Sequence, residues 1–333
     1  MNTGKKTRSS KPDDFRVIKP YHANSMPMEE RALFKTFLKD KQTEYNQVGR
    51  LSYASFFYKY LSLDSALLCI KNSNIRFVEP SRWQDKYERR FYQADYSSQN
   101  VDIQKECPLL FATCLTTTRY DEAAWVLYTY NKTGLGATCV EFQINKHKFR
   151  LQLAKALETG DRIYEGVVMY CSPTMIDNIH KKKVLEKGVL VDNKYYQKYV
   201  ARKENLDYLN NYLNLLLMKR DVFKHENETR FFIAKQSKLS SPKIRQNIEG
   251  EKVYYGDAIT LNIDWLEIID KVYINAKEDS YEYRLLEDAL RANMEAKYKE
   301  KTDKERNDIW DKRLKPIPYF VYGEALSTPL IIE

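Results

Sequence analysis

Three charged residues at the head of an apolar run are the part of the sequence best suited to chemistry. The run is FKHENETRFFIA, residues 223–234, and Glu226, Glu228 and Arg230 precede its apolar end. The β-prone residues that follow predict a strand entering a core. Because side chains alternate along a strand, all three charges would point to one face. Two carboxylates and a guanidinium at that place are unfavourable unless they are solvated, paired or used in a reaction.

No other short motif in the chain specifies a known kind of catalytic or phosphate-binding loop. The chain has 10 glycines, and its single GxG, at Gly134 and Gly136, fits neither a Rossmann fingerprint nor a Walker loop. The 4 histidines are scattered singly, so no zinc site is predicted and we expect no bound metal. The sequence also lacks GxSxG. Catalysis is therefore left to carboxylates and basic groups that the fold brings together.

Strands and helices alternate around residues 223–234. They predict an α+β fold with a mixed sheet as its core and helical additions at both ends. Strands are predicted over residues 56–60, 75–78, 109–115, 138–144, 163–171, 253–255, 258–262 and 268–274. Helices are predicted over residues 27–45, 64–70, 145–160 and 206–217, and from residue 121 onward.

The chain divides into three predicted parts. Residues 1–27 are rich in basic side chains and include Pro12 and Pro20 in the first twenty positions, which predicts a flexible basic arm. Residues 28–278 form the α+β core domain. Residues 279–333 add a long charged helix, from Tyr281 to Asp311, and an extended segment, and both are expected to pack on the core.

The charge balance favours an anionic partner. The net charge is +9, with 30% of residues charged, which suits a nucleic acid or a nucleotide. A protein partner fits as well, and solubility alone also explains a surplus of this sign. The oligomeric state is not specified by any feature of the sequence.

Cysteine use and hydropathy predict a cytoplasmic protein. The 5 cysteines are odd in number and never form CxxC, which is typical of reduced, buried thiols. No run reaches the length of a membrane span, and no apolar signal core follows the first residues. We therefore expect no membrane association.

Five segments, taken in order, resemble an uncharacterised prokaryotic family, a domain of unknown function found near phage-defence genes. That family carries KYR, PSxFNDPFE, WxxYA, GxCxEF and WxxExExR motifs. The matching segments are FYKY (57–60), IRFVEPSRWQDKYE (75–88), AAWVLYTY (123–130), GATCVEF (136–142) and FKHENETRF (223–231). Gln84, Lys86 and Phe223 depart from the family's usual Asn, Pro and Trp. The resemblance implies an anti-phage defence effector.

The same order of elements is similar to the distant pattern of ADP-ribosyltransferases, which consume NAD. In those enzymes the second glutamate of a late Glu-x-Glu binds the nicotinamide ribose, and the first helps to activate the acceptor. The resemblance implies that Glu228 stabilises a ribosyl cation, that Glu226 is the acceptor-side base and that Arg230 orients the pair. A fixed carboxylate stabilises oxocarbenium character. A second carboxylate beside it is expected to have a raised pKa, which suits a base.

The resemblance also implies where NAD would bind. Lys59 and Tyr60 would meet its phosphates or ribose, and Trp125 and Tyr128 would pack against the nicotinamide. This hypothesis requires that Glu228, Lys59 and Trp125 line one cleft.

A structural explanation of these residues stands beside the catalytic one. On spacing alone, Glu-x-Glu-x-Arg is more typical of an exposed strand face held by salt bridges. Trp125 and Tyr128 are then core residues, and Lys59 is solvated.

Two further functions compete with NAD chemistry. A metal-dependent nuclease would hold Mg²⁺ with Asp85, Glu88 and Glu141. However, Gln143 stands where many such nucleases carry a lysine, two residues after a metal-binding carboxylate. A non-catalytic module would instead use aromatic and basic side chains to bind RNA or a phage protein.

Overall fold

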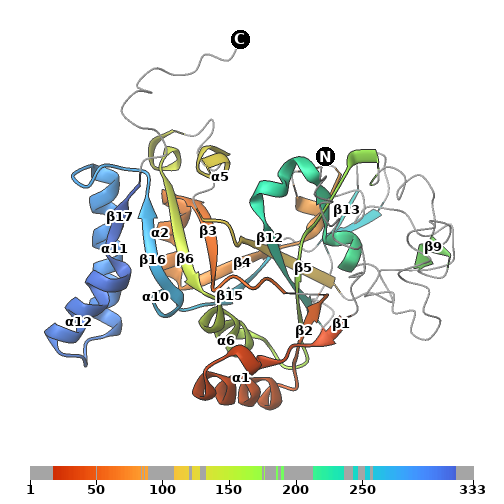
Figure 1. The fold of residues 1–333 in the computed structure, drawn as a ribbon, viewed down its shortest axis with the longest axis horizontal. Helices are drawn as coiled ribbons and strands as arrows, with labels where there is room; N and C mark the ends of the chain where they lie inside the picture. The colour runs from red at the N-terminus through yellow and green to blue at the C-terminus, as the bar shows by residue number, and fades with distance from the viewer. Residues whose placement is uncertain are drawn as a thin grey trace, which may run out of the picture.

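An 11-stranded mixed sheet forms the centre of the fold and confirms the α+β class (Figure 1). The computed structural model describes residues 18–49, 51–83, 85, 87–88, 109–119, 122–127, 133–174, 176, 185–186, 189–190, 213–235, 243–246, 252–255 and 258–319. Along the sheet, the strands are β1 (Ile18–Pro20), β2 (Glu44–Val48), β7 (Arg162–Val167), β12 (Glu228–Lys235), β5 (Leu109–Thr116), β3 (Phe56–Ser62), β6 (Cys139–Asn145), β16 (Ile269–Ile274) and β17 (Pro316–Pro318). The remaining two are β4 (Asn74–Val78) and β15 (Ala258–Asn262), which branch from β5.

Short elements and helices surround this sheet. The helices are α1 (Met28–Asp40), α2 (Leu63–Asn72), α5 (Glu122–Leu127), α6 (Lys146–Ala156), α10 (Trp265–Ile268), α11 (Tyr281–Lys297) and α12 (Asp303–Ile309). Single turns of other helix types are η1 (Ala23–Ser25), η2 (Pro80–Arg82), η4 (Gly134–Ala137), η5 (Asp221–Glu226) and η6 (Trp310–Leu314). Three strand pairs lie outside the large sheet: β8 (Met169–Cys171) with β11 (Met218–Arg220), β9 (Leu185–Glu186) with β10 (Val189–Leu190), and β13 (Lys243–Gln246) with β14 (Lys252–Tyr255).

The strand predicted from residues 223–234 forms β12, an interior strand of the sheet. β12 pairs antiparallel with β5 on one side and with β7 on the other. All eight of its residues are buried, because helices or loops cover both of its faces. Its apolar sequence FFIA matches this position, since a strand buried on both faces reads as a continuous apolar run.

A seam divides the sheet between β3 and β5. Among the described residues, one register pair, Tyr58 with Thr116, joins these two strands. At the middle of β5, Ala112 pairs instead with Val78 of β4. Both β3 and β4 therefore pair with β5, at different points along it.

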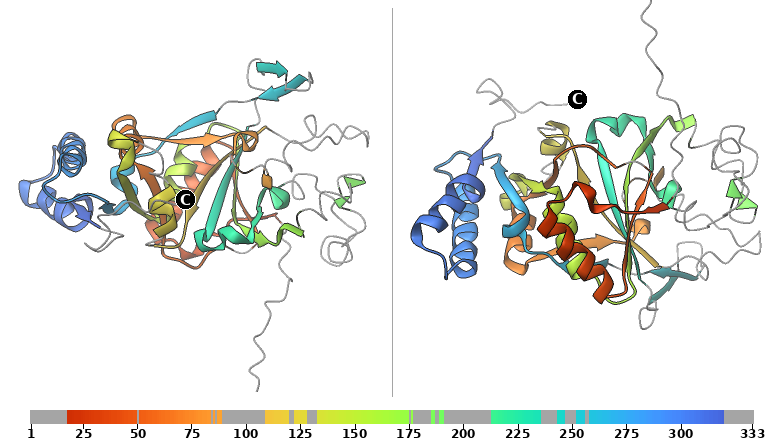
Figure 2. Two further views of the ribbon diagram at one scale, coloured as in Figure 1. Left: turned by 90° about the horizontal axis from the view of Figure 1, so that it is seen from above. Right: turned by 60° about the horizontal axis from the view of Figure 1, so that its bottom comes forward.

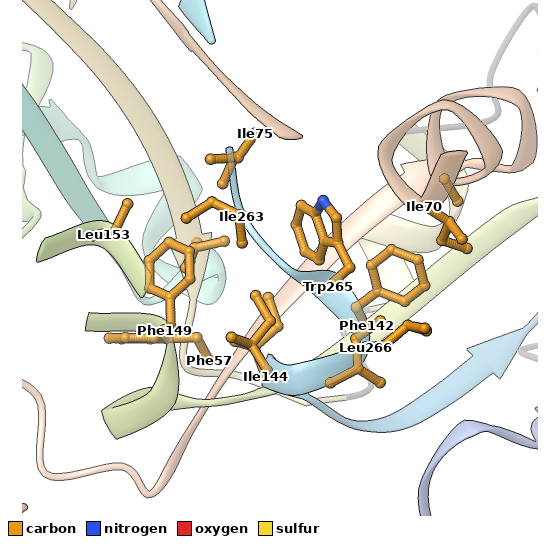
Figure 3. Packing of buried hydrophobic residues seen from close by; sticks show 14 of the residues in the cluster. Phe57, Ile70, Ile75, Phe142, Ile144, Phe149, Leu153, Ile263, Trp265 and Leu266 are labelled. Atoms are coloured by element: carbon orange, nitrogen blue, oxygen red, sulfur yellow. The ribbon is translucent and has the colours of Figure 1, made fainter. Parts of the chain in front are cut away.

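One face of the sheet carries the larger core. Helices α1 and α6 lie side by side over this face (Figures 1 and 2). Phe231 of β12 packs there between Phe57 and Phe149, with ring centroids 5.4 and 5.2 Å away. Figure 3 shows Phe57 and Phe149 close to Ile144, and Phe142 beside Trp265 of α10.

The opposite face carries a smaller core beneath residues 213–217. Phe232 and Leu217 belong to it, together with the strand residue Tyr164. Gly166 of β7 lies against this cover, because a Cβ atom there would stand 2.5 Å from Leu217 Cδ1. A side chain at position 166 would therefore displace Leu217 from the sheet.

The C-terminal addition differs from the single long helix predicted over residues 281–311. The chain forms α11, stops at Tyr298, and restarts at α12, where Thr302 and Glu305 make a reciprocal capping box. Figures 1 and 2 show α11 and α12 at one end of the molecule, beside β16 and β17. The extended segment predicted to follow begins as β17, parallel to β16. Residues 320–333 lie outside the described residues.

The end of the predicted basic arm contacts the core. Residues 18–20 form β1, which pairs with β2, and Met26 is buried. Residues 1–17 lie outside the described residues. The prediction of a helix over residues 27–45 is wrong at its end, because the helix stops at Asp40 and Glu44–Val48 is β2. Tyr45 and Val48 are buried in the two different cores, on opposite faces of this strand.

None of the helices within the described ranges combines the length and the apolar character that crossing a membrane requires.

Lys146, at the start of α6, ties the loop before β3 to the core. Its ammonium donates hydrogen bonds to the carbonyl oxygens of Ser52 and Ala54. Burial lowers the pKa of Lys146 from 10.5 to about 8, and the neighbouring Arg150 adds to the effect. The folded protein therefore releases this proton at a lower pH than the unfolded chain does.

Stability should rise with pH because of Lys146. Between pH 8 and 10.5 the unfolded lysine still holds a proton that the folded one has lost, and this adds at most about 1.4 kcal/mol per pH unit to the free energy of unfolding. Urea denaturation at several pH values should show that wild type gains stability relative to Lys146→Met across this window. Lys155→Met, an exposed lysine on the same helix, is the control. A difference between wild type and Lys146→Met that is constant with pH would contradict the assignment.

Candidate functional site

The three charges of the motif do not all lie on one strand, as the sequence predicted. β12 begins at Glu228, so Glu228 and Arg230 share a strand face, but Glu226 is the last residue of η5. Asn227 between them adopts the left-handed conformation, with φ 41° and ψ 51°. The polar sequence DVFKHE forms an exposed turn there, and asparagine tolerates the left-handed backbone better than most residues.

The charges nevertheless meet, through a lysine from another strand. Lys219 Nζ lies 2.5 Å from Glu226 Oε2, 2.9 Å from Glu228 Oε2 and 3.7 Å from Glu88 Oε1. Lys219 lies on β11, which pairs in parallel with β8. We call Glu88, Lys219, Glu226, Glu228 and Arg230 the ionic cluster.

Arg230 is the second cation of the ionic cluster. Its Nε donates to Glu228 Oε1 at 2.8 Å, and its terminal nitrogens donate to Glu88 and to the carbonyl oxygen of Leu216. The plane of the guanidinium also stacks on Trp83, 4.2 Å from the ring centroid. The side chain of Arg230 is 1% exposed. It is therefore a buried charge whose partners are supplied by three separate segments.

Burial within the ionic cluster is uneven. The side chain of Glu228 is 5% exposed, whereas that of Glu226 is 24% exposed. The salt-bridged alternative is thus right about pairing and wrong about an exposed face. Glu226 is the carboxylate of the motif that solvent reaches.

The two motif glutamates have pKa values displaced in opposite directions. Burial acts to raise the pKa of Glu228, but Arg230 and Lys219 outweigh it and hold that pKa well below its usual value. Burial raises the pKa of Glu226 above its usual value, with Lys219 opposing. The pKa of Glu88 is also raised, by burial against Arg230 and Lys219. The ionic cluster therefore keeps Glu228 ionised and makes Glu226 easier to protonate.

Tyr170 fixes the start of β12. The backbone N–H of Glu228 donates to the Tyr170 hydroxyl at 2.8 Å, and the N–H of Val168 donates to the Glu228 carbonyl at 2.9 Å. Both contacts come from the β7–β8 segment. They hold the backbone of Glu228 independently of its carboxylate.

Lys59 lies at the seam between β3 and β5. Its ammonium donates one long hydrogen bond, 3.4 Å, to the carbonyl oxygen of Cys114. Burial lowers the pKa of Lys59, and Cys69, Cys114 and Glu228 oppose that shift. Lys59 is therefore partly buried near Glu228 rather than solvated.

Tyr60 and Trp125 lie together in a packed aromatic group. Their ring centroids are 5.7 Å apart, and both side chains are buried. Tyr58, Cys139 and Tyr273 belong to the same group. This packing matches the core role foreseen for Trp125. Tyr128, the fourth predicted NAD contact, lies outside the described residues.

The cleft expected to join Glu228, Lys59 and Trp125 is not defined by these contacts. Tyr58 pairs with Thr116, and Thr116 pairs with Glu228, so the even-numbered residues of β3, including Tyr60, share the face of Glu228. Lys59 is directed to the opposite face because side chains alternate along the strand. The structure brings Tyr60 to Trp125, and it places Lys59 at the seam, on the face opposite Glu228.

The metal site predicted from Asp85, Glu88 and Glu141 is not assembled. Asp85 pairs with Arg220 at 3.0 Å, and Glu88 belongs to the ionic cluster. Glu141 lies on β6, opposite Tyr60 and three strands away from β12, which is about 14 Å at normal strand spacing. Within the described residues, no three His, Cys, Asp or Glu side chains are placed to hold a metal ion.

Lys219 and Tyr170 are the members of the site that sequence reasoning missed. Lys219 reads as the end of a helix in the sequence, and Tyr170 as part of a strand. The parallel pairing of β8 with β11 places Tyr170 opposite Lys219, and neither residue carries a local signal of this pairing. Glu88 was expected at a metal site rather than on Arg230.

No protein-family model, curated protein or solved structure matches the chain, so its family membership stays a prediction.

Proposed function

We propose that the protein is an NAD-consuming, ADP-ribosyltransferase-like enzyme in which Glu228 and Glu226 divide the chemistry between them. One observation carries the proposal: two carboxylates share the Lys219 ammonium and have pKa values displaced in opposite directions. Such a divergence is how paired acidic groups acquire different roles in catalysis. An ionised carboxylate suits charge stabilisation, and one with a raised pKa suits proton transfer.

Glu228 would stabilise the transition state. When the bond between ribose C1′ and the nicotinamide nitrogen breaks, nicotinamide leaves with the bonding electrons, and the ribose gains oxocarbenium character. A carboxylate held ionised and fixed by Arg230 Nε at 2.8 Å opposes that positive charge without reorganising. Arg230 then has an orienting role.

Glu226 would serve the acceptor. As the acceptor attacks ribose C1′, it loses a proton, and a carboxylate is needed to take it. Glu226 is the more exposed member of the pair and contacts Lys219 at 2.5 Å, so it keeps a defined position while remaining open to solvent. Its raised pKa brings it closer to the working range of a base.

The NAD contacts form a second part of the proposal. Lys59, beside the seam and near Glu228, supplies a cation for a phosphate or ribose oxygen. Tyr60 and Trp125, buried against each other, would support the wall of the site on the nicotinamide side. The role in phage defence is proposed on the family resemblance alone.

Labelled NAD, incubated with the protein and cell extract, tests this function. We expect wild type to release nicotinamide and transfer label, and Glu228→Gln to lose about 10²–10³-fold in kcat, as when one stabilising group is removed. In wild type, kcat should fall at low pH as Glu226 becomes protonated, and this fall should be absent in Glu226→Gln. Glu267→Gln, another carboxylate held by two lysines, is the matched control and should keep full activity.

Three outcomes would overturn the proposal. Turnover that persists in Glu228→Gln removes the role of Glu228. Mg²⁺-dependent cleavage of DNA or RNA without NAD loss favours a nuclease. Binding of RNA or of a phage protein with neither reaction favours a non-catalytic module.

A further inference from the structure

We propose that Asn227 is a positioning residue, clamped to Thr116–Thr118 so that Glu226 and Glu228 are held at a fixed spacing on Lys219. The inference deepens the proposed function and rests on it for its catalytic meaning. The contacts that hold the two carboxylates in place do not depend on whether the protein consumes NAD.

The backbone of Asn227 adopts an uncommon conformation. Its left-handed conformation, φ 41° and ψ 51°, is rare for a residue with a side chain. Such conformations persist where surrounding contacts enforce them, and they cluster at functional sites. Here the conformation turns the chain from the end of η5 into β12, and the Asn227 N–H donates to the Lys224 carbonyl at 3.3 Å. The turn thus sets the relative direction of residues 226 and 228.

The three threonines hold this turn from the end of β5. Thr116 Oγ1 donates to the carbonyl oxygen of Glu226. The Asn227 carbonyl accepts from Thr117 N at 3.2 Å and from Thr117 Oγ1 at 3.1 Å. The Asn227 amide then donates to Thr118 Oγ1 at 2.6 Å. These bonds continue the β5–β12 pairing past its last register pair, Glu228 with Thr116.

The clamp matters most for Glu226. Glu228 is held by Arg230, by Lys219 and, through its backbone, by Tyr170. The Glu226 carboxylate has one such bond, to Lys219, and the charged or titratable groups that face it are Lys219, Glu228, Glu88 and Tyr170. Its carbonyl is held by Thr116 and the next peptide by Thr117. Without these bonds from Thr116, Thr117 and Thr118, which we call the clamp, the exposed end of η5 is free to turn Glu226 into solvent.

Two variants remove one bond of the clamp while preserving the backbone. Asn227→Gly keeps a residue that favours the left-handed conformation but lacks the side-chain amide. Thr118→Val removes the acceptor of that amide with little change in shape. Ser73→Gly is the matched control, because Ser73 is also left-handed, with φ 46° and ψ 47°, at the end of α2.

Carbon-13 NMR titration of the Glu226 carboxyl is the main measurement. We expect its pKa to fall towards the usual glutamate value in Asn227→Gly and in Thr118→Val, since the group leaves its buried position. The double variant should show no further shift, and Ser73→Gly none at all. Unchanged Glu226 titration in both single variants, with native circular dichroism, would overturn the clamp.

NAD turnover separates this inference from the proposed function. If wild type consumes NAD, kcat should fall in Asn227→Gly by up to about 100-fold while KM for NAD stays constant, because misplacement affects the reacting groups rather than binding. Full activity in that variant would contradict a positioning role. If wild type consumes no NAD but the Glu226 pKa shifts as expected, the clamp stands and the proposed function fails.

Discussion

Replacing Arg230 with methionine should lower the free energy of unfolding by about 3–5 kcal/mol, because removing one partner of a buried ion pair leaves the others uncompensated. Glu228 and Glu88 would keep their charges in a buried place without the guanidinium that now binds both. Trp83 would also lose the cation stacked on its ring. Urea denaturation followed by circular dichroism at pH 7 measures the loss.

Arg220→Met is the matched control for this prediction. Arg220 pairs with Asp85 at 3.0 Å, but its side chain is 27% exposed. Removing a pair of that kind costs about 1 kcal/mol or less. If Arg230→Met and Arg220→Met lower the free energy of unfolding equally, burial does not make the ion pairs of Arg230 more important for stability.

The loss of unfolding free energy in Arg230→Met should also depend on pH. Arg230 holds the pKa of Glu228 below its unfolded value, so the stabilisation is present above the unfolded pKa and disappears as pH falls through the folded one. The difference between wild type and Arg230→Met should therefore shrink as the solution is acidified. A difference that grows towards low pH would show that Glu228 is not the group involved.

Phe231→Ala should be as damaging, for a different reason. Phe231 is fully buried between the rings of Phe57 and Phe149. Truncating a buried phenylalanine costs about 3–5 kcal/mol through lost transfer energy and the cavity left behind. Thermal or urea unfolding measures it. Val222→Ala, at a side chain that is 59% exposed, should change stability by less than about 0.5 kcal/mol.

The two large predictions concern consecutive residues on opposite faces of β12. The cost of Phe231→Ala comes from apolar packing and should be nearly constant with pH, whereas that of Arg230→Met should not. A Phe231→Ala loss as pH-dependent as that of Arg230→Met would mean that the cavity disturbs the ionic cluster across the sheet.

Elements set by local periodicity were predictable from the sequence. The aromatic, aliphatic and β-branched residues of β3, β4, β5 and β6 predicted strands close to the observed bounds. The β12 strand was predicted for the same reason. In contrast, β2 was predicted as the end of a helix, because its sequence EYNQV is mostly polar and shows no strand-like apolar run around the buried Tyr45 and Val48.

The candidate site was predictable only where it is local. Glu228 and Arg230 are two residues apart on one strand, so alternation placed them together correctly. Glu226 was misplaced because a single left-handed residue at Asn227 outweighs the alternation pattern. Lys219 and Glu88 reach the cluster through strand pairing and a distant turn, and no spacing in the sequence reports such contacts. Long-range pairing is a property of the whole fold.

The central place of β12 in the sheet has a consequence for how the chain is made. β12 joins β5 to β7, yet it follows both of them in the sequence. During synthesis from the N-terminus, β5 and β7 leave the ribosome with the edges that will receive β12 still unpaired. Closing the sheet then requires a long loop between β5 and β12, which makes this step slow. The strand that carries Glu228 and Arg230 of the ionic cluster is therefore also the one that covers these two edges when it pairs.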